Sequence, residues 1–180
     1  MKKKILLLAI ILLPMCASAQ TYLKFNGLYW ALGIINASVE TKLNDKLTFN
    51  TDAVFSPWES VGGYPFLIGM LMPEVRYYTR KANDGFYLGA FSTIHTYKMS
   101  KWDHIRKNEY QKGWGYGFGA SVGYQLPVSD RWNLDLYAGY GWVHGEYKGY
   151  YIDSGEKYTD WNGSGEWIPL KLGVSFSYRI

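Results

Sequence analysis

Histidine is the side chain best suited to acid–base chemistry near neutral pH, and the chain has three of them, His95, His104 and His144. Glu146 follows His144 by two residues, so in an extended strand both side chains point to the same face. A serine beside such a pair could act as the nucleophile in acyl transfer or hydrolysis, and Ser92 is the candidate. These residues define an enzyme hypothesis that depends on the strands that carry them.

The predicted strands separate the members of that set. Ser92 falls on a strand that another strand separates from the one carrying His144. His95 has the predicted inward parity of Tyr87, Phe91 and Tyr97, which is typical of a packed histidine, whereas His104 lies in a basic loop and is expected to be solvated. Three scattered histidines without repeated ligand spacing, in a mature chain without cysteine, predict no catalytic, cofactor-binding or metal-binding residues.

A second group of ionisable side chains occupies positions that the alternation of polar and apolar residues places inside. Buried charges are costly unless they are paired, so we predict a network of ion pairs with Glu74 and Arg76 at its centre. The alternative is a polar path for protons or small ions, which we favour less because eight strands enclose a space that side chains fill. The group consists of Lys24, Glu40, Asp52, Glu74, Arg76, Asp135 and Lys171.

The alternation itself predicts eight strands with one apolar face each. From Trp114 to Phe118 every second residue is aromatic and each residue between is glycine, which predicts rings outward and glycines toward a narrow lumen. From Leu172 to Ile180 apolar residues alternate with Gly, Ser and Arg. The predicted strands are 22–30, 34–43, 46–56, 67–79, 86–98, 113–126, 131–146 and 166–180.

The connections between these strands differ in length. Those at Asn44-Asp45, at 81–85 and at 127–130 are short, and a tight connection is expected near Leu32-Gly33. The remaining three, at about 57–66, 99–112 and 147–165, are long. Short turns at one end and long loops at the other are typical of an outer-membrane barrel.

Composition decides which face meets lipid. A soluble barrel of the lipocalin kind would carry a charged outer face, whereas the polar face here is mostly Gly, Ser, Asn and Tyr. A glycine-rich edge strand of a soluble sandwich is the remaining alternative. Aromatic residues gather near strand ends, as in interfacial girdles, at Trp30, Trp58, Trp114, Trp132, Trp142 and Trp167. We therefore predict an all-β fold, an eight-stranded antiparallel transmembrane β-barrel of up-and-down topology.

Residues 1–19 have the basic start, apolar run and Ala-Ser-Ala ending of a secretory signal peptide, so the barrel domain is expected to span 20–180. A second interpretation makes Cys16 a lipidated N-terminus, although Met15 stands where lipoprotein processing normally requires a small residue. The net charge of +4 includes three lysines of this leader. The remainder is nearly balanced and predicts no nucleic-acid partner.

Four segments resemble a known family: 26–50, 73–79, 113–125 and 131–143. They are similar to short outer-membrane barrels of Bacteroidota, which are Gram-negative, catalogued as a domain of unknown function and close in architecture to OmpA/OmpX-type barrels. The resemblance implies a cell-envelope location in the outer membrane and a partnership with surface appendage systems. It brings no catalytic or ligand motif, so no site residue is implied.

The expected function is non-enzymatic. We expect a barrel with a closed polar lumen that has a structural or anchoring role, or that interacts with partners at the cell surface through its outer loops. The segment 98–112 is basic and 147–165 is rich in tyrosine, which suits recognition or binding to headgroups and lipopolysaccharide phosphates. Expected partners are outer-membrane lipid and lipopolysaccharide, the barrel-assembly machinery, and a surface protein or appendage. The alternatives are an enzyme that modifies the acyl chains of lipid A and a narrow pore.

Overall fold

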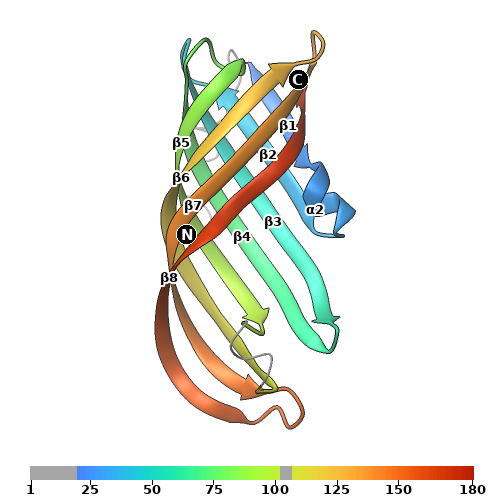
Figure 1. Ribbon diagram of the computed structural model, residues 1–180, viewed down its shortest axis with the longest axis vertical. Coiled ribbons are helices and arrows are strands. Elements are labelled where there is room, and N and C mark those ends of the chain that lie inside the picture. Colours follow the sequence, from blue (N-terminus) through green and yellow to red (C-terminus); the bar gives the residue numbers. More distant parts are fainter. Residues whose placement is uncertain (1–19, 102–106) are drawn as a thin grey trace, which may run out of the picture.

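The computed structural model describes residues 20–101 and 107–180, and within them eight antiparallel strands close into a barrel (Figure 1). Each strand pairs with the next in the chain and the last pairs with the first, so the predicted up-and-down topology is confirmed. No helix in the described ranges is long and apolar enough to cross a membrane. The strands are β1 (Thr21–Asn26), β2 (Ile35–Lys42), β3 (Leu47–Val61), β4 (Tyr64–Tyr78), β5 (Gly85–Met99), β6 (Glu109–Pro127), β7 (Trp132–Tyr151) and β8 (Lys157–Arg179).

The end opposite the short turns is built from strands more than from loops, which corrects two predictions. The expected loop 57–66 is the end of a β3–β4 hairpin that turns at Gly62 and Gly63, both with positive φ. The expected loop 147–165 is largely a continuation of β7 and β8, paired as far as Tyr150↔Lys157. At the end of β3 and the start of β8 the alternation of buried and exposed side chains is lost, which is why these extensions resemble loops in the sequence.

The wall of the barrel is uneven in height. β1 has 6 residues and β2 has 8, whereas β7 has 20 and β8 has 23. Figure 1 shows the β7–β8 hairpin extending far below the level at which the short strands end, and a short helix, α2 (Gly27–Ala31), follows β1 at that level.

Helix α2 replaces the second half of the predicted strand 22–30, so that prediction is wrong beyond Asn26. The Asn26 side chain accepts a hydrogen bond from the backbone N–H of Leu28 and thereby starts the helix. Trp30 consequently lies on a helix, where its ring N–H donates to the carbonyl oxygen of Asn36 at 2.9 Å.

The ring closes at a short seam between β1 and β8. Five residue pairs join the two strands, from Tyr22↔Arg179 to Asn26↔Ser175. The Asn26 amide reinforces the seam, because its Nδ2 donates to the carbonyl oxygen of Leu172 at 2.9 Å and to the Tyr137 hydroxyl at 3.0 Å.

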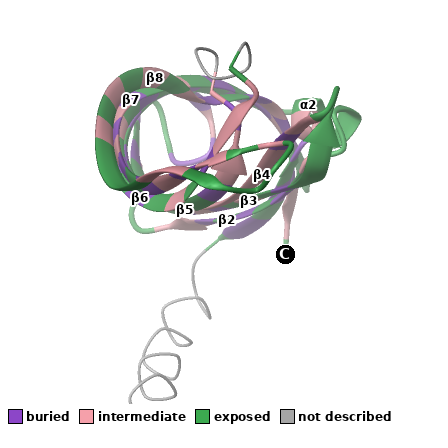
Figure 2. Ribbon diagram, turned by 90° about the horizontal axis from the view of Figure 1, so that it is seen from below, coloured by how far each residue is buried: buried purple, intermediate pink, exposed green. Residues whose placement is uncertain are grey.

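The two faces of the wall have opposite chemistry. Large apolar side chains on the outside are exposed, including Leu88 at 53% and Leu136 at 46%. Ionised side chains on the inside are buried, with Arg76 at 1% and Glu40 at 0%. Seen along the barrel in Figure 2, the purple buried segments belong to the ring of strands. The arrangement inverts that of a water-soluble protein, in which the apolar side chains form the core.

The glycines of β6 face inward, as predicted, and make room for the large side chains of β5. A Cβ atom on Gly119 would lie 2.5 Å from the ring of Phe91 and 2.4 Å from the carbonyl oxygen of Tyr140. On Gly115 it would lie 2.5 Å from Nε2 of His95. Because the obstruction includes backbone as well as flexible side chains, β6 approaches β7 too closely here for any larger residue.

Candidate functional site

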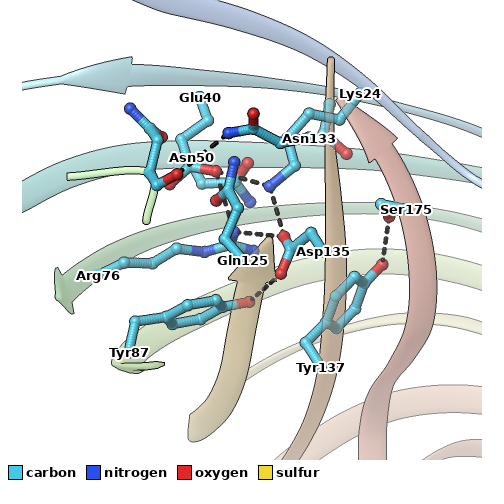
Figure 3. Close-up of polar contacts among 12 residues, drawn as sticks. Lys24, Glu40, Asn50, Arg76, Tyr87, Gln125, Asn133, Asp135, Tyr137 and Ser175 are labelled. Atoms are coloured by element: carbon cyan, nitrogen blue, oxygen red, sulfur yellow. Dashed lines mark hydrogen bonds and ion pairs between the residues drawn. The ribbon is translucent and has the colours of Figure 1, made fainter. Parts of the chain in front are cut away.

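The centre of the lumen is occupied by Arg76, which reaches across from β4 (Figure 3). Its Nη1 donates to Oε2 of Glu40 at 3.0 Å and to Oδ2 of Asp135 at 2.9 Å. Its Nε donates to Oε2 of Glu74 at 2.8 Å. One guanidinium therefore joins carboxylates from β2, β4 and β7, and all four side chains are at most 1% exposed.

Two lysines complete the ion-pair network. Lys24 Nζ lies 2.6 Å from Glu40 Oε2 and 2.5 Å from Asp135 Oδ2. Lys171 Nζ lies 2.6 Å from both Asp52 Oδ2 and Glu74 Oε2. All seven ionisable residues that the alternation placed inside are in this network, three cations facing four carboxylates, and the predicted centre at Glu74 and Arg76 is confirmed.

Tyrosine and amide side chains fill the remaining cross-section. The Tyr78 hydroxyl contacts Glu40 Oε1 at 2.7 Å and Gln125 Oε1 at 2.6 Å. The Tyr87 hydroxyl donates to Asp135 Oδ1 at 3.1 Å, and its ring lies 4.6 Å from the Arg76 guanidinium carbon. Neither Tyr78 nor Gln125 was predicted as a member of the network, although Tyr78 has the inward parity of Glu74 and Arg76 and could have been found from it.

The residues of the enzyme hypothesis are not brought together. Ser92 faces outward opposite Phe118, whereas His144 lies opposite Tyr116 and stacks on the ring of Trp142 at 5.9 Å. Glu146 is exposed on the outer face, opposite Trp114. In the described part of the chain, no three His, Cys, Asp or Glu side chains are arranged to hold a metal ion. His104 lies outside the described residues.

His95 faces inward, as predicted, on β5 between Thr93 and Tyr97, which face the lumen as well. Its ring centroid is 5.8 Å from that of Tyr97. Thr93 Oγ1, His95 Nδ1 and the Tyr97 hydroxyl are buried without a hydrogen-bond partner among the described residues. The lumen beyond the ion-pair network is thus lined on one side by polar atoms that water or a small polar group could satisfy.

Lys101, in the basic segment 98–112, is not a solvated loop charge. Its side chain is 23% exposed, forms an ion pair with Glu166 and donates to Ser164 Oγ at 3.1 Å. The Nζ atom also lies 5.9 Å from the centre of the Tyr147 ring. The reason is the extension of β8, which carries Glu166 and Ser164 on its inward face opposite Val143 and Gly145.

Aromatic rings gather at two levels of the outer face. At one level Trp142 contacts Phe118, with ring centroids 5.7 Å apart, and Tyr116 at 6.3 Å. Near the short turns, Trp132 packs on Tyr178 at 5.0 Å. Both groups are on strands whose intervening outward residues are apolar, and we call these two levels of rings the girdles.

The ends of β5–β8 that extend beyond the girdle at Trp142, called the tall wall below, carry a cluster of tyrosines. Tyr110 stacks on Tyr150 with ring centroids 5.2 Å apart, and Tyr151 packs on Tyr158 at 5.5 Å. Partial burial, and secondarily Tyr150, raise the pKa of Tyr110 above its ordinary value. Trp161 is 62% exposed on the same hairpin. This end offers rigid rings to a partner.

Comparison with known proteins identifies a protein-family model, described as “Protein of unknown function (DUF3575)”, that matches residues 4–180. Neither the curated proteins nor the solved structures contain a significant match.

Proposed function

We propose that this chain, which belongs to the DUF3575 family of proteins of unknown function, is a non-enzymatic anchor that spans the outer membrane with a closed lumen. Its tall β5–β8 wall then projects beyond the lipid and contacts a surface protein or appendage. Outer-membrane lipid, lipopolysaccharide and the barrel-assembly machinery are its remaining partners.

The observation that carries this proposal is the inversion of the two faces, apolar outside and ionised inside. The two girdle tryptophans of β7, Trp132 and Trp142, are ten residues apart. At about 3.3 Å per residue and a strand tilt of about 40°, this corresponds to about 25 Å along the membrane normal. That is the height of the apolar band of a transmembrane barrel.

The interaction role is supported by the residues that face outward beyond the girdle. Rigid tyrosine and tryptophan rings provide contact area at a small cost in conformational entropy. Here they are held on paired strands, with Tyr110↔Tyr150 and Tyr150↔Lys157 in register, and hence need little further ordering on binding.

The location and the closed lumen are tested together. We expect the exported chain to fractionate with outer membranes and to resist extraction by salt or alkali. Purified protein in planar bilayers should show no stable conductance steps, because Arg76 and its partners cross the lumen. Recovery as a soluble periplasmic protein would overturn the membrane proposal, and stepwise conductance would favour a pore.

The interaction role of the β7–β8 hairpin is tested by substituting exposed side chains, which leaves the pairing of the two strands intact. We expect Trp161→Ser with Tyr151→Ser to reproduce the surface phenotype of a gene deletion while membrane insertion stays normal, since both rings are exposed. The matched control is Trp132→Ser with Tyr77→Ser, which removes two exposed rings at the opposite end. A hairpin variant with the wild-type phenotype would contradict the interaction role.

A further inference from the structure

Three lysines form a row across the outer face of the tall wall. Lys98 of β5 is the register partner of Lys112 of β6, which is in turn the partner of Lys148 of β7. They share the outward parity of Trp114, which is 45% exposed. Since neighbouring strands are about 4.8 Å apart, the three stems leave the wall within about 10 Å of one another.

The row lies in a groove with a volume of about 540 Å³, whose lining also includes Trp114, Tyr150 and Trp161. Two of the lysines lie over rings: Lys98 Nζ is 5.2 Å from the centre of Tyr110, and Lys148 Nζ is 4.8 Å from that of Trp161. The groove thus combines ammonium groups with flat aromatic faces.

No carboxylate of the described residues forms an ion pair with these lysines, whereas seven other described lysines and arginines do form ion pairs. Glu146 lies one row closer to the girdle, opposite Trp114, and faces outward without an ion pair to any lysine or arginine of the described residues. Like charges on directly opposed residues destabilise a sheet. A bound anion would remove that repulsion from both pairs.

The level of the groove indicates which anion. Lys112 is two residues beyond Trp114 on β6, so it follows the aromatic girdle on the side away from the apolar band. In a membrane, that is the level of lipid headgroups and their phosphates. The membrane placement is itself the function proposed above, and the present inference rests on it.

We propose that this groove binds the phosphorylated sugar headgroup of a glycolipid of the lipid A type. Three ammonium groups spaced over about 10 Å exceed what one small phospholipid phosphate can contact. The flanking rings provide apolar faces on which the C–H face of a sugar can stack. Lysine binds phosphate as a point charge without a fixed geometry. This suits a bound lipid headgroup that exchanges with other lipids at the barrel surface.

The inference is tested with the full exported chain, purified in detergent and titrated with lipid A. We expect the variant Lys98→Ala, Lys112→Ala, Lys148→Ala to bind about 100-fold more weakly than the wild type, because each lysine near an anionic surface contributes about fivefold. The matched control is Lys42→Ala, Lys46→Ala, Lys81→Ala, which removes the same charge at the opposite end and should bind as the wild type does.

Two further ligands identify the recognised group. Dephosphorylated lipid A should bind the wild type as weakly as phosphorylated lipid A binds the triple variant. Equal affinity for phosphatidylglycerol would overturn the choice of a glycolipid, and equal losses in both triple variants would overturn the site. If the wild type inserts into membranes but does not bind lipid A, this inference fails alone. If it does not insert, the proposed function fails first.

Discussion

Arg76→Ala should lower the free energy of unfolding by about 3–5 kcal/mol, the cost typical of removing one partner from a buried ion pair. The substitution leaves Glu40, Glu74 and Asp135 without the guanidinium that joins them. Lys24 and Lys171 remain, so the lumen would hold four carboxylates against two cations. Urea titration of the barrel refolded in detergent or lipid vesicles measures the change.

The control for this substitution is Lys107→Ala, since Lys107 is exposed and should change stability by less than about 0.5 kcal/mol. Lys101 is unsuitable because it pairs with Glu166. Adding Glu74→Gln to Arg76→Ala should recover part of the loss, because it removes one of the unpaired charges. If the Arg76 and Lys107 variants unfold alike, Arg76 faces water and the inward parity of β4 is wrong.

Leu136→Arg should cost about 2–4 kcal/mol in lipid vesicles, the penalty for a cation near the middle of the bilayer on the lipid face of a barrel. Leu136 is 46% exposed and lies between Tyr124 of β6 and Val174 of β8, inside the apolar band. Refolding into vesicles followed by urea titration provides the measurement.

Val128→Arg is the matched control, because Val128 is 66% exposed in the short turn between β6 and β7. The same charge outside the band should cost less than about 1 kcal/mol. On a water-soluble barrel both exposed positions would accept arginine with little change. Similar stabilities of the two variants would therefore contradict the membrane-spanning proposal.

The sequence predicts the wall of this barrel well because each residue's face follows from a period of two. The alternation along β4 was enough to place Glu74 and Arg76 inside. The alternation along β6 likewise placed Trp114 and Tyr116 outside. The distances between strands are not needed for such a prediction. Ion pairing could be predicted as well, because charges buried inside a closed ring of eight strands find their ionic partners among one another.

The elements that could not be predicted are those in which local contacts override the period. The strand begun at Thr21 ends because the Asn26 side chain caps a helix, and alternation alone does not reveal a cap. Beyond the girdle, β7 and β8 have no apolar face, so their pairing is invisible in hydropathy. The burial of Lys101 depended on that pairing, because Glu166 reaches it only from an extended β8.

The five-pair seam between β1 and β8 also bears on the order in which the chain folds. Every other pairing joins neighbours in the sequence, whereas the seam joins residues 22–26 to residues 175–179, and closing so long a loop carries the largest entropic cost. Lys24 is on β1 and reaches Asp135 only when the ring is shut. Closure thus brings Lys24, which also pairs with Glu40 of the neighbouring β2, to a second carboxylate across the lumen. Closure of the seam and completion of the ion-pair network are therefore one event, which makes a half-closed barrel a poor resting state.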